Sequence, residues 1–435
     1  MEWWVLLIIV LGVLMALFLS GLPVAFAFLT FNIIGIVIWM GADSLHLMAV
    51  AILPNIGLFS FVTVPLFILM GELLFRTGLT ELIITAIGKW LGKVRGSLSL
   101  AGVAAGTLFA MMSGSSISGV AVLGSTLIPE MRAKGYSKEM SIGPILGAGG
   151  LAMIIPPSIL CVMVAILAQV NVGKLLIAGV IPGLILAGFY VVYILVRAHL
   201  QPHLAPSFAP PQVSWNERFK ALAVASPLVI IIFLVLGLIF MGITTPSEAA
   251  ATGAAGTLLL AIAYRKLTWL KLKAAILESA LITGMVFMIL LSSATFSQLL
   301  AYTGTSGALA ASATGAVVPP IVMVIIMQLV MILLGMFVDV VSIIMITIPI
   351  FFPIIRALGF DPIWFGILML VNIEMAEFSP PFGLLNFVMK GVVPDASMGD
   401  IVKSGIPFFL MGLVLLGVML VAPSVVTWLP GLMGR

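Results

Sequence analysis

The sequence predicts an all-α polytopic membrane protein, built as an inverted repeat with two re-entrant helical hairpins and two broken helices. Three observations predict this fold: an apolar composition, a pattern that recurs 224 positions later, and two apolar blocks that are interrupted at the middle. Of the 435 residues, 63% are hydrophobic and 8% are charged, whereas soluble domains carry about 25% charged residues. The mean hydropathy is +1.34. An integral membrane protein with several helical spans is therefore expected.

The recurring pattern consists mainly of proline, glycine and arginine, and its two copies align without a gap. The matched residues are Pro129 and Pro353, Arg132 and Arg356, Ala133 and Ala357, Gly135 and Gly359, Leu146 and Leu370, Ala152 and Ala376, Pro156 and Pro380, and Pro157 and Pro381. A proline pair removes two backbone donors and disfavours helix at the preceding residue. In a membrane, such breaks persist only where the freed backbone lines a protein-buried cavity. Paired breaks in two halves of a membrane chain therefore point to a transport site.

Ten apolar stretches are long enough to cross a bilayer. They lie at about 3–19, 22–40, 61–77, 138–170, 175–196, 223–241, 248–264, 280–300, 361–389 and 404–422. The stretches at 138–170 and 361–389 contain the proline pairs and are the two predicted broken helices.

Two further apolar blocks, 97–127 and 318–352, are each interrupted near the middle, at 112–116 and 335–339. Half of such a block is about 14–16 residues, or roughly 21–24 Å of helix. This length reaches the midplane of a bilayer core of roughly 30 Å but does not cross it comfortably. We interpret both blocks as re-entrant hairpins that enter and leave on the same side.

The basic residues support this topology. With the N-terminus outside and ten crossings, all Lys and Arg residues except Lys174, Arg356 and Arg435 fall inside, which is a strong positive-inside bias. Both chain termini are then predicted to be periplasmic. Each half has five crossings, and an odd number places the second half upside down relative to the first. The predicted repeats are residues 1–200 and 223–435.

A proline-rich cytoplasmic linker is expected at 201–222, between the two repeats. The segments 79–94 and 267–279 are amphipathic and carry basic residues. Helices of this kind usually lie along the membrane surface. We therefore predict one surface arm helix in each repeat.

The first hairpin tip concentrates small polar residues where the midplane is predicted. It contains Ser113, Gly114, Ser115, Ser116 and Ser118. Serines at a tip can cap the returning half-helix, whose amides and dipole then face an anion. The alternative is tight helix packing by small residues.

The broken helices predict a second part of the site. Gly149 and Gly150, followed by the first proline pair, are expected to unwind the helix, and Pro157 with Ser158 can restart it. Carbonyls in such a gap are hard oxygen donors that suit Na⁺. The second break runs from Ala376 to Gly383. A simple proline kink is the alternative for either break alone.

Asp339 lies in the second hairpin at the repeat position of Ser115, and Ser342 matches Ser118. An ionisable residue at the bilayer midplane is costly and is functional by default, so Asp339 is the leading candidate for a cation ligand. Glu374 and Glu377, beside the second break, are weaker candidates. Glu72 and Glu248 lie near span ends and are expected to be solvated or to make packing contacts.

Two sets of site residues follow. The substrate-binding candidates are Ser113, Gly114, Ser115, Ser116, Pro157, Ser158, Pro381 and Gly383. The Na⁺-binding candidates are Ser116, Ser118, Gly149, Gly150, Asp339, Ser342, Glu377 and Ser379.

Signatures of catalysis are missing from the sequence. It contains no HExxH, GxSxG or Walker motif, its three histidines form no ligand-spaced cluster, and Cys161 is its single cysteine. We therefore expect neither enzymatic activity nor a cofactor. Without a nucleotide site, the energy for transport must come from an ion gradient or from another subunit. The basic residues lie in loops that face a membrane and do not indicate nucleic-acid binding.

Several motifs resemble the large membrane subunit of TRAP transporters, the DctM-like permeases. They are the run from Met112 to Met131, the segments Ile154–Ile159 and Ile181–Gly183, and the segment Leu358–Gly366. The likeness covers essentially the whole chain. One departure lies after the second break, where many members read close to T-P-P-V-G-L-N and this chain has Ser379-Pro380-Pro381-Phe382-Gly383-Leu384-Leu385-Asn386.

The resemblance implies an elevator-type secondary transporter of the bacterial inner membrane that imports a carboxylate-bearing organic solute with Na⁺. It implies two partners, a small four-helix membrane subunit and a periplasmic solute-binding protein. By position, Ser116, Ser118 and Asp339 fall in the hairpin tips where the family binds ions and substrate. Two other functions remain open: a stand-alone anion/Na⁺ symporter, and a structural or channel-like membrane component.

Overall fold

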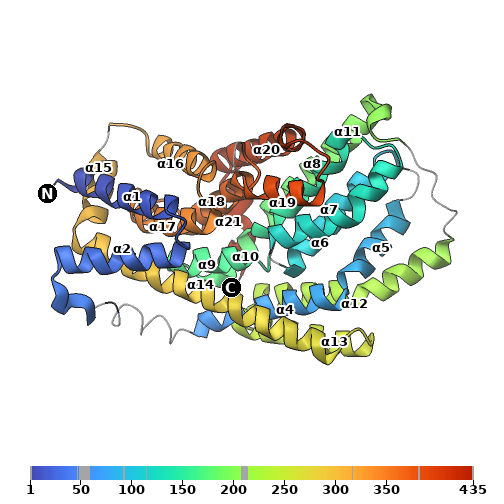
Figure 1. Cartoon of the computed structure of the whole chain (residues 1–435), viewed down its shortest axis with the longest axis horizontal. Helices are drawn as coiled ribbons and strands as arrows, with labels where there is room; N and C mark the ends of the chain where they lie inside the picture. Colours follow the sequence, from blue (N-terminus) through green and yellow to red (C-terminus); the bar gives the residue numbers. More distant parts are fainter. Residues whose placement is uncertain are drawn as a thin grey trace.

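The computed structural model describes residues 2–46, 48, 59–91, 94–113, 115–206, 214–315, 317–380 and 383–433. The described residues form helices and short connections (Figure 1). Five of the described helical segments are long and apolar enough to cross a membrane unaided, and several shorter apolar helices accompany them. The prediction of an all-α polytopic fold is confirmed.

The first half of the chain runs to the start of the linker. Its helices are α1 Trp3–Leu19, α2 Val24–Trp39, η1 Ala42–Leu45, η2 Phe59–Val62, α4 Thr63–Thr77, α5 Thr80–Leu91, α6 Ser97–Ser113, α7 Ser116–Ala133, α8 Lys138–Gly150, η3 Leu151–Met153, α9 Ile159–Leu167, α10 Val172–Ala178, α11 Val180–Leu200 and η4 Pro202–Leu204.

The second half repeats this order of elements. Its helices are α12 Trp215–Phe240, α13 Pro246–Ala263, α14 Trp269–Tyr302, α15 Thr305–Gly315, α16 Pro320–Gly335, α17 Val340–Ala357, α18 Pro362–Ala376, α19 Leu384–Val392, α20 Met398–Val421 and α21 Ser424–Gly431.

Both predicted hairpins are pairs of helices that turn back at the expected tips. The pair α6–α7 approaches from one end of the long axis and the pair α16–α17 from the other, as an inverted repeat requires (Figure 1). The broken helices are equally clear, since α8 and α9 are separated by η3 and a short stretch of turn and bend, and α18 and α19 by residues 377–383. The peptide bond Pro156–Pro157 is cis.

The arm helix predicted at 267–279 is wrong as a separate element. Residues 269–302 form a single helix, α14, which Thr268 caps at its N-terminus. The predicted span at 280–300 simply continues it, because no glycine or proline breaks the chain between residues 268 and 283. The counterpart of α5 is instead α15, which follows Gly304 as α5 follows Gly78. Both glycines have positive φ, which glycine adopts without steric cost.

The linker predicted at 201–222 also differs from the structure. Its first residues include η4, and its last part already belongs to α12. Helix α12 begins at Trp215 because Ser214 and Glu217 form a capping box, which satisfies two amides at the helix start. The arm helix predicted at 79–94 is observed as α5 and packs against α6 and α12.

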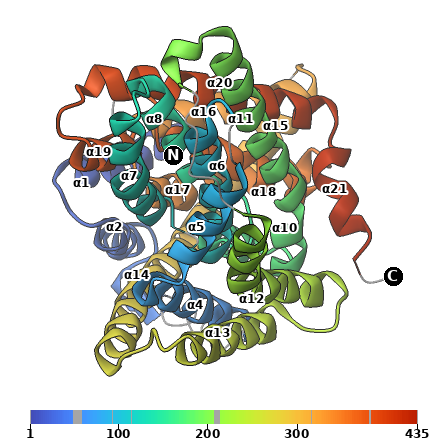
Figure 2. The ribbon, with the colours of Figure 1, turned by 90° about the vertical axis from the view of Figure 1, so that its right-hand side faces the viewer.

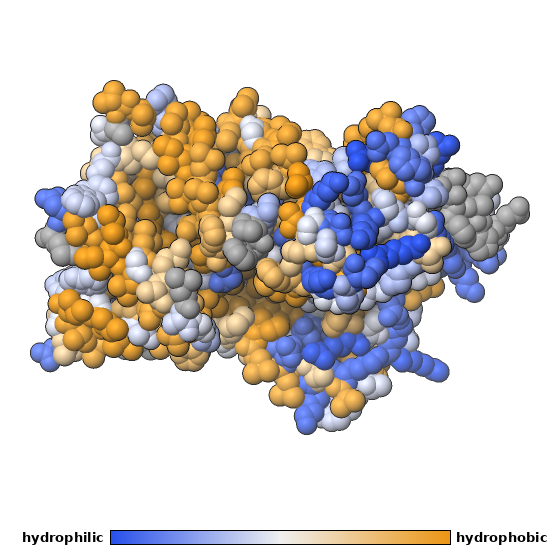
Figure 3. Space-filling view, turned by 45° about the horizontal axis from the view of Figure 1, so that its top comes forward, coloured by the Kyte–Doolittle hydropathy of each residue, from blue (hydrophilic) through white to orange (hydrophobic). Residues whose placement is uncertain are grey.

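The core lies in the broken helices, and the long helices at the periphery expose their side chains. Every residue of α18 from Trp364 to Ala376 is buried, whereas α14 exposes large apolar side chains such as Leu281 and Met285. Seen end on, α4, α12, α13 and α14 lie together on one side of α8, α18 and α20 (Figure 2). On the face shown in Figure 3, hydrophobic residues cover much of the surface and most hydrophilic residues lie toward the right-hand end.

The arginines of the sequence repeat fasten each hairpin to the other half of the chain. Arg132, at the end of α7, forms an ion pair with Asp395, which follows α19. Arg356, at the end of α17, donates a hydrogen bond to the carbonyl of Ala168, which follows α9. The hydrogen bond from Arg132 holds the pKa of Asp395 below its usual value. Both hairpins are therefore joined to the broken helix of the opposite repeat.

Candidate functional site

The first side of the candidate site is the N-terminus of α7. Ser115 caps the helix: its Oγ accepts a hydrogen bond from the Ser118 amide at 3.3 Å and lies 3.1 Å from the Ser118 hydroxyl. The cap satisfies one amide of the first turn, and the amides of Ser116 and Ile117 have no acceptor within the helix. Gly114 lies outside the described residues, as does the side chain of Ser113.

The N-terminus of α17 forms the opposite side. Asp339 caps this helix and accepts hydrogen bonds from the amides of Val341 at 3.0 Å and Ser342 at 3.2 Å. The Ser342 hydroxyl donates to the other carboxylate oxygen. An ionised carboxylate has about four lone-pair sites, so three bonds leave room for one more partner.

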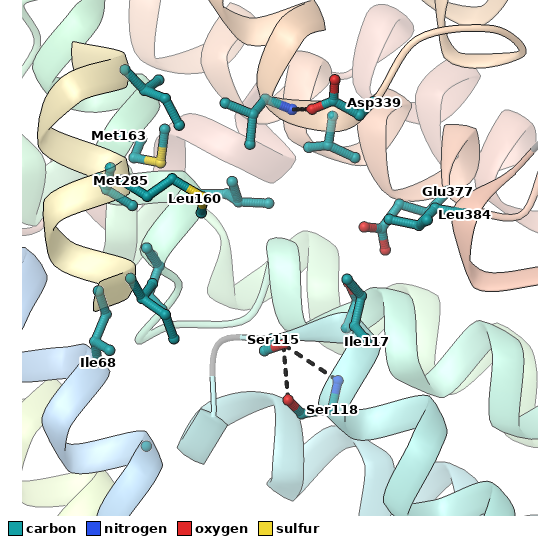
Figure 4. Close-up of a pocket in the computed structure, with 18 of the residues that line it drawn as sticks. Ile68, Ser115, Ile117, Ser118, Leu160, Met163, Met285, Asp339, Glu377 and Leu384 are labelled. Atoms are coloured by element: carbon teal, nitrogen blue, oxygen red, sulfur yellow. Dashed lines mark hydrogen bonds between the residues drawn. The ribbon is translucent and has the colours of Figure 1, made fainter. Parts of the chain in front are cut away.

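The two tips share a cavity of about 240 Å³. Figure 4 shows Ser115 and Ser118 on one side, with Asp339 and Glu377 facing them across the open space. The apolar wall comes from Ile68 on α4, from Leu160 and Met163 on α9, and from α14. The structure thus brings together five of the predicted site residues, which are Ser115, Ser116, Ser118, Asp339 and Glu377.

Glu377 contributes the most deeply buried carboxyl group of the cavity. The residue is 5% exposed, and its Oε2 has no hydrogen-bond partner among the described residues. The Ser116 side chain hydrogen-bonds to this carboxyl group, which links the first hairpin to the second broken helix. Asp339 and Glu377 also line an adjoining cavity of about 190 Å³.

The cavity is acidic. Its carboxyl groups belong to Glu72, Asp339 and Glu377, and no Lys or Arg occurs among the described residues that line it. Glu72 was not predicted as a site residue. The sequence signal that could have identified it is the presence of an ionisable residue inside the apolar segment 61–77. Arg76, one turn further along α4, donates to Glu72 at 2.8 Å and lies 3.7 Å from Glu278 on α14.

The first break supplies no lining residue between Gly149 and Ser158. Gly149 and Gly150 lie within helix α8, so the prediction that they unwind the chain is wrong. The side chain of Ser158 caps α9, accepting from the Cys161 amide at 3.2 Å and donating to the Met153 carbonyl at 2.8 Å. Pro157 does not line the cavity either, and Ser158 acts by capping α9, whose Leu160 and Met163 line it.

The second break is held by side-chain and backbone hydrogen bonds to its own carbonyl groups. Ser379 donates to the Ala376 carbonyl at 3.0 Å, the Gly383 amide donates to the Ser379 carbonyl at 3.0 Å, and Asn386 donates to the Phe378 carbonyl at 3.2 Å. Ser379 and Gly383 do not line the cavity. Pro381 lies outside the described residues.

A comparison with protein families identifies the family of this chain. The family model described as "Tripartite ATP-independent periplasmic transporter, DctM component" matches residues 11–425. The chain belongs to the DctM family. The resemblance seen in the hairpin and proline motifs is thereby confirmed, and a DctM component is a transporter permease and not an enzyme.

Curated relatives cover almost the whole chain. The C4-dicarboxylate TRAP transporter large permease of Rhodobacter capsulatus is 32% identical and is aligned over 98% of this chain and 99% of its own length. The ectoine TRAP transporter large permease of Halomonas elongata is 28% identical, with 98% of this chain and 99% of its own length aligned. The sialic acid large permease of Vibrio cholerae is 26% identical, with 96% of this chain and 97% of its own length aligned. These names cover several solutes, so DctM membership alone does not name one.

A solved structure has a similar fold. The Alcanivorax borkumensis YdaH transporter superposes with a TM-score of 0.64, at 15% identity, over 91% of each chain. At this identity the likeness concerns the fold alone.

Proposed function

We propose that this chain is the transmembrane permease subunit of a Na⁺-coupled importer of a small carboxylate-bearing organic solute. The observation that carries the proposal is the cavity that the two hairpin tips share, which is lined by three carboxyl groups and by no described basic residue. An anion that enters such a cavity meets carboxyl groups of like charge, of which Glu72 is paired with Arg76, and like charges repel one another. The anion needs accompanying cations, and this requirement couples solute to ion.

Oxygen atoms suitable for Na⁺ are concentrated at the tips. Carboxylate and hydroxyl oxygens are hard donors that suit hard cations. Asp339 with Ser342 offers them on α17, and Ser116 with Glu377 offers them across the cavity. We assign the coupling ions to these groups and to Ser118, with no other cofactor.

The solute carboxylate would lie at the start of α7. The free amides of its first turn and its helix dipole favour negative charge, and Ser115 and Ser118 add hydroxyl groups. Asp339 already satisfies the corresponding amides of α17, so that helix end suits a cation better. The volume of about 240 Å³ suits a small organic acid.

Transport would proceed by an elevator motion in the bacterial inner membrane, with both termini in the periplasm. The cross-repeat contacts of Arg132 and Arg356 support a rigid moving unit of hairpins and broken helices. The solute would arrive from a periplasmic binding protein, and a small four-helix membrane subunit would complete the scaffold. The family's description as tripartite and ATP-independent supports these partners.

Substitution of Asp339 tests the Na⁺ assignment. Asparagine caps helices about as well as aspartate, so Asp339→Asn keeps the cap of α17 and removes only the charge. We expect Na⁺-dependent uptake of solute to be lost in both Asp339→Asn and Asp339→Ala, measured in proteoliposomes that contain the complete transporter. Membrane insertion and oligomeric assembly should be unchanged in the asparagine variant.

If Asp339→Asn keeps Na⁺-dependent uptake while Asp339→Ala loses it, Asp339 serves only as a helix cap and the assignment fails. The partners are tested in the same assay by omitting one component at a time. Uptake by this chain alone would identify a stand-alone symporter and contradict the proposed tripartite assembly.

A further inference from the structure

A second buried carboxyl group lies outside the cavity. Glu374, in the last turn of α18, is fully buried. Tyr190 on α11 donates a hydrogen bond to its Oε1 at 3.0 Å, and its Oε2 has no hydrogen-bond partner among the described residues. No ion pair within the described part of the chain includes Glu374. The carboxyl group is not used by the proposed transport site.

Glycines make room for this side chain. A Cβ atom at Gly150 on α8 would lie 2.7 Å from Glu374 Oε1. A Cβ at Gly412 on α20 would lie 3.9 Å from Oε2 and 2.4 Å from the sulfur of Met375. Tyr190 is fixed against Phe408 with ring centroids 4.9 Å apart. Glycine positions on α8 and α20 thus lie close to this carboxyl group.

No positive charge faces the group. The helices around it carry other charged or titratable side chains. These are Lys138 and Glu139 on α8, Cys161 on α9, Lys174 on α10, Tyr193, Arg197 and His199 on α11, Arg356 on α17, Glu377 directly after α18, and Asp400 and Lys403 on α20. Several of these form ion pairs with one another near helix ends, as Lys138 does with Asp400 and Arg197 with Glu139. Only Tyr190 bonds to Glu374.

An isolated carboxylate in such surroundings carries a large desolvation cost, and the group avoids it by staying neutral. A proton needs only the carboxyl group itself.

We propose that Glu374 is a proton-binding site, separate from the transport cavity, which holds one proton in this conformation. The neutral group lets Gly150, the last residue of α8 before the first break, pack directly on α18. Loss of the proton would place an uncompensated charge at this contact. Alkaline conditions would then disturb the packing of the two broken helices, and through it the cavity that they support.

Infrared difference spectroscopy on the full-length chain in lipid nanodiscs tests the site without measuring transport. A buried protonated carboxyl group gives a C=O stretching band apart from those of the amide groups. We expect this band in the wild type, its loss in Glu374→Gln, and its retention in Glu377→Gln. If Glu374→Gln does not fold, Tyr190→Phe replaces it, and removal of the hydrogen bond should shift the band. A wild-type spectrum without such a band, or a band that neither substitution alters, would overturn the proposal.

The functional consequence rests on the proposed uptake activity and is measured separately. We expect the ratio of uptake at alkaline pH to uptake at mildly acidic pH to be severalfold lower in the wild type than in Glu374→Gln, whose amide cannot lose a proton. Equal ratios would contradict the role of Glu374 in pH sensitivity. If the wild type shows no Na⁺-dependent uptake, the proposed function fails, while the infrared result still decides whether Glu374 holds a proton.

Discussion

At the scale of single residues, the two hairpin tips cap their returning helices with different side chains. Ser115 and Asp339 occupy matching repeat positions, and each caps the returning helix of its hairpin. The serine adds no charge and leaves the dipole of α7 available to an anion, whereas the aspartate cancels part of the dipole of α17. The repeat therefore supplies matching geometry at both tips, and the difference between Ser115 and Asp339 makes the two tips chemically unequal.

Gly150 gives a prediction at this scale. A methyl group there would meet Glu374 Oε1 at 2.7 Å and Cγ at 2.8 Å. Gly150→Ala should therefore overpack the core and lower the free energy of unfolding by about 1–3 kcal/mol. We expect a lower melting temperature in detergent and reduced uptake. The matched control is Gly188→Ala on α11, where a Cβ meets nothing within 4 Å and the substitution should stabilise the helix slightly. Equal melting temperatures for the two variants would contradict the close packing of α8 on α18.

At the scale of elements, helices from opposite repeats are joined at their ends. Arg356 donates a partly buried hydrogen bond to a backbone carbonyl of the first repeat, while Arg132 pairs with the exposed Asp395 of the second. A hydrogen bond from a charged group contributes about 1.5–3 kcal/mol, and an exposed ion pair about 0–1 kcal/mol. The two junctions are thus equivalent in position and unequal in strength.

We therefore expect Arg356→Ala to lower the melting temperature clearly and Asp395→Asn to lower it little. Arg356→Lys keeps the charge but has a compact ammonium group in place of the planar guanidinium, so it should recover only part of the loss. Thermal unfolding of the three variants in the same detergent measures this order. A larger loss for Asp395→Asn than for Arg356→Ala would contradict it.

At the scale of the whole molecule, the cavity is shared between long peripheral helices and the broken-helix core. Met285 on α14 and Leu160 on α9 line the same space (Figure 4). An elevator motion would carry Leu160 past Met285 in every cycle. The native Cys161 is buried, so the chain offers a convenient background for introduced cysteines.

We predict that a reducible cross-link between Leu160→Cys and Met285→Cys abolishes uptake and that reductant restores it. Each single-cysteine variant, treated in the same way, is the control and should keep uptake. Full uptake by the cross-linked protein would show that α9 does not move relative to α14, and the elevator motion would then be abandoned.

Much of the fold could be predicted from the sequence because local signals specify it. Composition determined the membrane class, the interruptions at 112–116 and 335–339 marked the hairpins, and the proline pairs marked the broken helices. The failures came where the signal was not local. The amphipathic segment 267–279 has no stop signal before α14 continues, and the glycines at 149 and 150 resemble a helix break when their tertiary partners are unknown.

By itself, the sequence determined the repeat, the hairpins, and the presence of Asp339 and Glu377 at interruptions. Only the tertiary structure decided which of these groups meet. Glu72 lines the cavity, and Gly149, Gly150 and Ser158 do not. Glu374 lies outside it and accepts a hydrogen bond from Tyr190, 184 positions away. The physical reason is that backbone breaks and caps act within a few residues, whereas a cavity is formed by packing between helices that are remote in sequence.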